Sequence, residues 1–136
     1  MRFKQRATKW CHVTVTTYRR RKVFKIAATA RFCERVVRDA CAEHGWHVDT
    51  VAVHADTIQA LLEVPKDVRR GTVVRRLKAA AAAVIRTRPI CDAGRRVFET
   101  GHWCAVVADG AKVAAVRRHI RRRAGGVSTP TAGERR

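Results

Sequence analysis

Acidic residues are scarce in this chain of 136 residues, where 11 Asp and Glu stand against 30 Lys and Arg. The formal net charge is therefore +19, which favours a polyanionic partner over a merely solvated basic surface. Among polyanions, nucleic acid is the first expectation and an anionic membrane the second. Hydrophobic residues make up 46% of the chain, so the high charge does not indicate a disordered protein.

Long apolar runs are missing as well. No stretch approaches the roughly 20 apolar residues that a membrane-spanning helix needs. The basic N-terminal residues are not followed by the apolar segment of a signal peptide. We therefore expect a cytoplasmic protein without a membrane partner.

The chain contains no C-x-x-C pair among its five cysteines, which are Cys11, Cys33, Cys41, Cys91 and Cys104. Their odd number and irregular spacing argue against a disulfide framework and against a structural zinc site. In a reducing cytoplasm such cysteines are expected to pack as small hydrophobic side chains.

What the sequence does contain is an alternation of strand and helix patterns. β-branched and aromatic residues predict strands at 10–18, 46–55, 58–64 and 102–107. Apolar residues at helical spacing predict helices at 27–44, 67–87 and 112–122. The remaining segments are expected to be a basic N-terminal lead (1–9), a loop (88–101) and a disordered tail (124–136), which leaves one domain at 10–123.

This order of elements predicts an α+β fold, a ferredoxin-like βαββαβ sandwich. In such a fold the antiparallel sheet carries two helices on one face, and here a C-terminal helix follows. We expect the other face of the sheet to be open. On a basic protein, an open antiparallel face is a natural platform for nucleic acid.

Five short segments of the chain also occur in a characteristic order: His12–Arg20, Gly45–Val48, Val73–Lys78, Ile85–Arg86 and Gly101–Trp103. Together they resemble the small single-tyrosine transposases of bacterial insertion sequences and the tyrosine transposases associated with repetitive extragenic palindromes. Both groups belong to the His-hydrophobic-His superfamily of endonucleases. The resemblance extends over residues 10–123.

The resemblance implies that the catalytic residues have been replaced. The family binds Mg or Mn through two histidines that alternate on a strand and a glutamine on the last helix, and a tyrosine on that helix attacks DNA. Thr57 and Gln59 occupy the histidine positions, His119 that of the tyrosine and Arg123 that of the glutamine. Because a guanidinium repels a cation, we expect no metal, no cofactor and no catalytic residue here.

The sequence thus predicts a transposase-like homodimer that binds DNA hairpins or single strands without cleaving them. The candidate DNA-binding residues are basic side chains from three segments: Arg19, Arg20, Arg21, Lys22, Arg75, Arg76, Lys78, Arg117, Arg118, Arg121, Arg122 and Arg123. Trp10, Trp46 and Trp103 are candidates for stacking on unpaired bases, with core packing as the alternative.

Two other functions stay open at this point. One is an active DNA transposase or nuclease that uses unrecognised residues such as His119. The other is an RNA-binding protein on the same fold. A different metal site would require that folding bring together His12, His54 and His102, which are on or near predicted strands.

Overall fold

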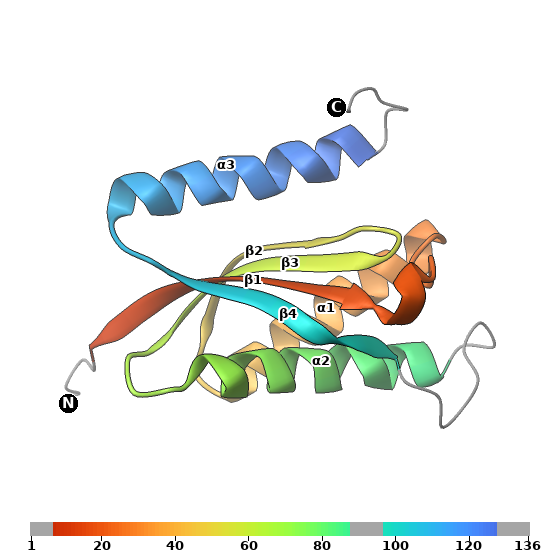
Figure 1. Cartoon of the computed structure of the whole chain (residues 1–136), viewed down its shortest axis with the longest axis horizontal. Coiled ribbons are helices and arrows are strands. Elements are labelled where there is room, and N and C mark those ends of the chain that lie inside the picture. Colours follow the sequence, from red (N-terminus) through yellow and green to blue (C-terminus); the bar gives the residue numbers. More distant parts are fainter. Residues whose placement is uncertain (1–6, 88–96, 128–136) are drawn as a thin grey trace.

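The computed structural model describes residues 7–87 and 97–127 (Figure 1). Its elements follow in the order that the sequence predicts, so the βαββαβ fold with an added C-terminal helix is confirmed. They are β1 (Thr8–Thr17), the short 3-10 helix η1 (Tyr18–Arg20), α1 (Ala27–Glu43), β2 (His47–Val53), β3 (Thr57–Pro65), α2 (Arg70–Arg86), β4 (Phe98–Val107) and α3 (Gly110–Val127).

The four strands form one antiparallel sheet in the order β2-β3-β1-β4. β1 lies inside the sheet and pairs with β3 on one side and with β4 on the other. Its alternate residues Cys11, Val13 and Val15 are fully buried on one face of the sheet, as period-two alternation requires. β2 and β4 are the two edge strands.

The main core lies between the sheet and the pair α1 and α2, which cover the same face (Figure 1). Helical spacing places Cys33, Val37 and Cys41 in one buried row of α1. Cys11, Cys33 and Cys41 are buried as free thiols and pack as small hydrophobic side chains, while Cys91 lies outside the described residues.

Glycine ends α1 at the position where the sequence predicts a cap. Gly45 has a φ of +78°, a left-handed conformation that side chains with a Cβ rarely adopt. The N–H groups of His44 and Gly45 donate to the carbonyls of Cys41 and Ala42, so the helix end is satisfied before β2 begins.

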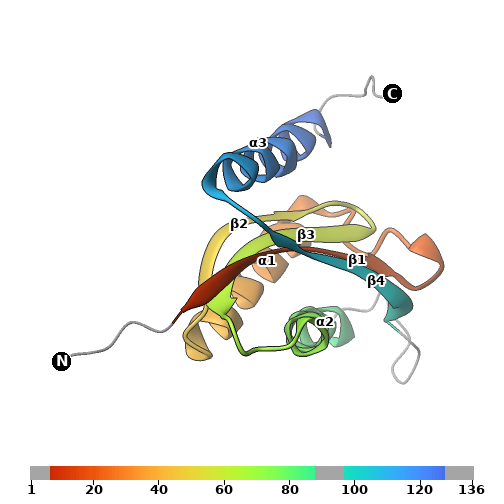
Figure 2. The ribbon, with the colours of Figure 1, turned by 60° about the vertical axis from the view of Figure 1, so that its left-hand side comes forward.

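α3 lies on the opposite face of the sheet from α1 and α2 (Figure 2), and this corrects the expectation of an open face. Val113 and Ile120, seven residues apart and so on one side of the helix, are buried with Ala52 and Leu61 of the sheet. Although the helix is basic overall, Val113 and Ile120 form a sparse apolar stripe, and this stripe packs against the sheet. The sheet face beneath it is consequently a second, smaller core.

The largest boundary differences from the sequence prediction are at the start of β4 and at the end of the last helix. β4 begins at Phe98, inside the segment predicted as a loop, because Phe98 is buried and pairs with Thr17 beyond a β-bulge in β1. The last helix begins at Gly110 and continues to Val127, past the predicted end at 122. The Asp109 carboxylate accepts the N–H of Lys112 at 3.0 Å and so caps the first turn of α3.

Among the helices that the structure describes, none has the length and apolar character needed to cross a bilayer.

Candidate functional site

Two of the residues that the resemblance assigns to the family's ligand positions lie on the sheet face covered by α3. Ile58, Ala60 and Leu62 of β3 point into the main core beneath the sheet. Strand alternation therefore turns Thr57 and Gln59 to the other face, where Leu61 contacts α3. Both Thr57 and Gln59 are buried.

His12 of β1 connects Gln59 to the last helix. Its ring lies 6.4 Å from the ring of His119 and 4.6 Å from that of Trp103, measured between centroids. Burial lowers the pKa of the His12 imidazole below its usual value, Gln59 partly opposes this, and His119 adds to it. His12 is therefore neutral near pH 7, and Gln59, His12 and the exposed His119 form one cluster at the α3 face.

Buried polar atoms of this cluster lack hydrogen-bond partners within the described part of the chain. These atoms are Nε2 of His12 and Oε1 of Gln59. The Gln59 side chain affects the charge of His12, although Gln59 Oε1 and His12 Nε2 each lack a partner in hydrogen-bond geometry. The cluster at the α3 face is thus not a closed hydrogen-bond network.

The hydroxyl of Thr57 is engaged with the neighbouring Asp56. Its hydroxyl donates to Oδ1 of Asp56 at 2.9 Å, and Oδ2 of Asp56 pairs with Nε of Arg20 at 3.3 Å. Arg123 belongs to α3, but its side chain lies outside what the structure describes. The carboxylate next to Thr57 is therefore already paired with a cation.

These residues do not fit a magnesium or manganese ion. Hard divalent cations take several oxygen ligands, with carboxylates prominent among them. Among residues 7–87 and 97–127, no group of three or more His, Cys, Asp or Glu side chains is arranged to hold a metal ion. The donor set at the family's two histidine positions is one hydroxyl and one neutral amide, and His12, His54 and His102 do not form a group of three that could hold a metal ion.

The basic segment after β1 is held in a defined conformation. Arg19 and Arg20 have φ values of 55° and 54°, and each left-handed residue costs roughly 1–2 kcal/mol. The backbone N–H of Arg19 donates to Glu99 of β4 at 2.6 Å, and Thr17 Oγ1 donates to the carbonyl of Arg21 at 2.7 Å. We call residues 19–22 the basic turn. Hydrogen bonds within the fold thus hold the backbone that carries its exposed side chains.

Some candidate DNA-binding residues have other partners in the fold. Lys78 donates to the carbonyls of Glu99 and Thr100 at 2.8 and 3.4 Å, and burial lowers its pKa. The guanidinium of Arg117 makes two hydrogen bonds to the Asp49 carboxylate, at 2.8 and 2.7 Å. Arg76 lies over the Trp46 ring at 5.3 Å. These side chains contribute to structure as well as to positive charge.

The candidate basic residues divide between the two faces of the sheet. α2, with Arg75 and Arg76, packs on one face, and α3, with Arg118, Arg121 and Arg122, lies over the other (Figures 1 and 2). The basic turn lies at the end of the sheet toward which α3 runs. Folding therefore brings the basic turn toward the C-terminal part of α3, and separates both from the basic residues of α2.

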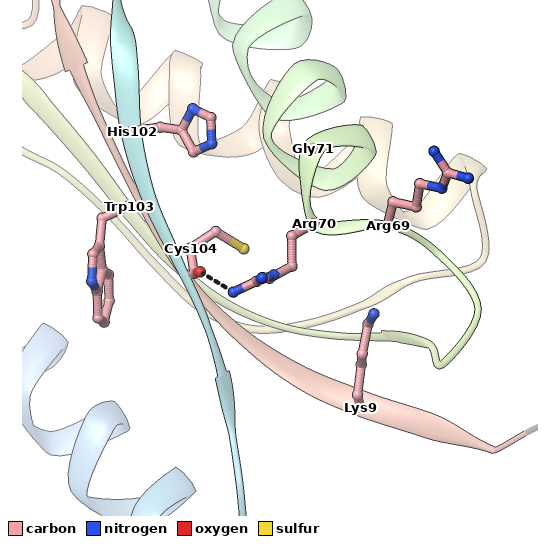
Figure 3. Close-up of a pocket in the computed structure, with 7 residues that line it drawn as sticks. All are labelled: Lys9, Arg69, Arg70, Gly71, His102, Trp103 and Cys104. Carbon is pink, nitrogen blue, oxygen red and sulfur yellow. Dashed lines mark hydrogen bonds between the residues drawn. The ribbon is translucent and has the colours of Figure 1, made fainter.

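One basic site, a pocket at the N-terminus of α2, could not be identified from the sequence. A pocket of about 650 Å³ at the N-terminus of α2 is lined by Lys9, Arg69, Arg70, Gly71, His102, Trp103 and Cys104 (Figure 3). The adjacent arginines were visible as part of a basic helix. Their convergence with the start of β1 and with β4 depends on the strand register, which the sequence does not reveal. We call this site the cationic pocket.

The three tryptophans have different environments. Trp46 is buried in the main core, and Trp10 packs against the smaller core beneath α3. Trp103 is 50% exposed on the edge strand β4, so it is the tryptophan best placed to meet an unpaired base.

Comparisons with known proteins agree with this fold. A transposase of Deinococcus radiodurans R1, so described from its crystal structure, superposes with a TM-score of 0.65 over 90% of this chain and 97% of its own, at 18% identity. A REP-associated tyrosine transposase bound to a REP hairpin gives 0.63 over 88% of this chain and 70% of its own, at 10% identity.

No curated protein matches the sequence. The model of the family described as "Transposase IS200 like" matches residues 6–123, which is most of the chain and includes every strand, α1, α2 and the cluster around His12. The chain belongs to the IS200-like transposase family.

Proposed function

We propose that this chain is a transposase-like protein that binds DNA hairpins or single strands and does not cleave them. The observation that carries the proposal is the chemistry at the family's catalytic positions. Thr57 and Gln59 supply a hydroxyl and an amide at the positions where the family has its two histidines. Within the described ranges, His12 and His119 are joined by no further side chain that would complete a group of three metal ligands.

DNA is the partner that family and charge favour together. A solved relative with the same fold is bound to a REP hairpin, and this chain carries a net charge of +19. The basic turn lies at the end of the sheet toward which α3 runs (Figure 1), and α3 carries the exposed Arg118, Arg121 and Arg122. Phosphate contacts from such side chains supply most of the sequence-independent affinity for DNA.

The finer parts of the proposal concern assembly and location. We infer a homodimer, since an unpaired strand edge such as that of β4 favours pairing between copies. The proposed function also places the protein in the cytoplasm, where DNA is accessible in bacteria. No metal or cofactor is required for binding itself.

Salt dependence of hairpin binding tests this proposal. The protein is titrated against a labelled, blunt-ended DNA hairpin at several salt concentrations, and log K is plotted against log salt. In the double variant Arg19→Gln/Lys22→Gln, two exposed charges of the basic turn are lost. We expect the slope to become shallower by about 1.8, because each duplex phosphate contact contributes about 0.9.

The matched control removes two exposed arginines from the outer side of α1, in Arg31→Gln/Arg35→Gln. This control is expected to leave the slope nearly unchanged. If both double variants changed the salt slope equally, DNA binding would depend on total charge alone. That result would contradict a defined DNA-binding surface. A hairpin RNA of the same sequence that binds more tightly than the DNA would favour the RNA-binding alternative.

A further inference from the structure

The cationic pocket is formed where three elements meet (Figure 3). Lys9 comes from the start of β1, Arg69 and Arg70 from the N-terminus of α2, and His102 from the edge strand β4. Arg70 is turned toward β4, where its Nη1 donates to the carbonyl of Cys104 at 3.4 Å. Basic side chains from distant parts of the sequence therefore line one hollow.

The positive charge of this pocket is not compensated. The ion pairs of the described residues are Arg20 with Asp56, Arg38 with Glu34 and Arg117 with Asp49. Lys9, Arg69 and Arg70 therefore have no carboxylate partner within the described part of the chain. Closely spaced cations repel one another, so this arrangement is stabilised when an anion enters.

A buried thiol nearby responds to the same charge. The pKa of Cys11 is lowered, first by a hydrogen bond with Cys104 and then by the charges of Lys9 and Arg70, against the opposing effect of burial. The positive potential thus extends from the pocket into the sheet beneath it.

The N-terminus of α2 adds to the positive potential of the pocket. Its first turn contains no acidic residue, and its N-terminal N–H groups at Arg70 and Gly71 are among those that a helix leaves without internal partners. A Cβ added at Gly71 would meet no atom within 4 Å, so the backbone there is open to a ligand. Cations and helix dipole together favour a phosphate group.

The size of the pocket and its aromatic edge narrow the ligand further. A volume of about 650 Å³ is in the range of sites for small organic ligands and exceeds what a lone inorganic anion needs. Trp103 projects from the other side of β4 relative to Cys104 (Figure 3), with half its surface exposed. Where the edge of β4 is not paired with a second copy, a nucleotide whose phosphate enters the pocket can bring its base over the edge strand to this indole.

We propose that the cationic pocket binds a phosphate of single-stranded DNA, and that Trp103 stacks on the adjoining unpaired base. This inference rests on the proposed function, since it assigns a second contact to the same DNA-binding protein. It adds a site for unpaired nucleotides on the edge strand and at the N-terminus of α2. That site is separate from the basic turn and from α3, which we propose as the surface for hairpins.

The test compares two labelled DNAs, a short oligothymidylate and the blunt-ended hairpin. In Arg69→Gln/Arg70→Gln the log–log salt slope for the oligothymidylate is expected to become shallower by about 0.7, the contribution of the one single-strand phosphate that the pocket holds. In Trp103→Ala we expect affinity for the oligothymidylate to fall about 5- to 140-fold, the range for loss of one stacked base. Hairpin binding should change little in both variants.

Controls separate this inference from the proposed function. Arg31→Gln/Arg35→Gln removes the same charge and should leave oligothymidylate binding unchanged, and circular dichroism verifies folding of each variant. Millimolar inorganic phosphate that displaces the oligothymidylate fully would show a simple anion site and overturn the nucleotide assignment. If the wild-type protein binds the hairpin but not the oligothymidylate, or if the pocket variants weaken both DNAs equally, the inference is wrong and the proposed function stands. If neither DNA binds, the proposed function itself fails.

Discussion

Asp49 and Arg117 form the best-defined ion pair in the described part of the chain. The two side chains meet through parallel hydrogen bonds of 2.8 and 2.7 Å, and they tie α3 to the edge strand β2. The Arg117 hydrogen bonds lower the pKa of Asp49 to about 2, against the opposing effect of burial. Arg117 was predicted as a DNA contact, and its partner gives it a structural role as well.

We expect Asp49→Asn to lower the free energy of unfolding by about 1 kcal/mol at pH 7, because the pair is partly exposed to solvent. A lowered carboxyl pKa means that the pair stabilises the fold above about pH 4 and that this contribution is lost as the pH falls toward about 2. Urea unfolding at pH 7, 4 and 2 measures this contribution to the free energy of unfolding. The variant should show a flatter pH dependence than the wild type.

Asp39→Asn is the control for this prediction, since Asp39 is an exposed carboxylate on the outer side of α1. Its pH dependence should follow that of the wild type. A wild-type pH dependence in Asp49→Asn would show that the ion pair adds nothing to stability.

At the scale of single elements, α3 differs from α1 and α2 because it packs on the smaller core and not on the main one. Its buried contacts are Val113 and Ile120 against a small cluster, while α1 and α2 share the main core. Three arginines of α3 remain exposed on its outer surface: Arg118, Arg121 and Arg122. A helix docked by so few side chains is expected to open locally at a lower free energy than the core strands.

Ile120→Ala tests how α3 is held. Ile120 is fully buried, and such truncations cost about 2–5 kcal/mol. We expect the helix to undock while the rest of the fold survives. Hydrogen exchange should therefore become faster throughout α3 and stay slow in β1 and β3. Ala115→Ser, on the exposed side of the helix, is the control. Equal acceleration in the central strands would mean that α3 and the sheet form one cooperative unit.

At the scale of the whole molecule, the exposed edge of the sheet is the feature that bears on assembly. β4 presents an unpaired edge, and Val106 on this strand is 49% exposed. Edge strands with exposed apolar residues pair readily with another copy, and a lysine on the edge discourages this.

We expect the wild-type protein to elute as a dimer in size-exclusion chromatography with light scattering, and Val106→Lys to shift it toward the monomer. His47→Lys places the same new residue on the opposite edge strand, β2, and should leave the dimer intact. A wild-type monomer at micromolar concentration, or dissociation by His47→Lys alone, would contradict pairing through β4.

Much of the fold could be predicted because its signals are local. The strand at residues 10–18 has β-branched residues in alternation, and Gly45 ends a helix that has a buried row at helical spacing. The covered sheet face could not be predicted, because the buried apolar side chains within residues 110–122 of α3 are Val113 and Ile120, amid arginines. Its partner surface comes from β2 and β3, far away in the sequence.

The candidate site was predicted only in part, for a similar reason. Thr57, Gln59 and His119 could be identified from the family's motifs, but His12 enters the cluster through strand pairing. The cationic pocket depends on the register that places Lys9 near the start of α2. Motifs identify residues along the chain, whereas a site that combines three elements requires the fold.

The central claim, binding without cleavage, is tested most directly by a single assay. A labelled DNA hairpin with unpaired ends is saturated with the protein in Mg²⁺ or Mn²⁺ and then analysed on a denaturing gel. The account predicts full-length DNA only, with no covalent protein–DNA adduct. Shortened DNA or an adduct that disappears in His119→Ala would contradict it and show that this chain cuts DNA with residues its family does not use.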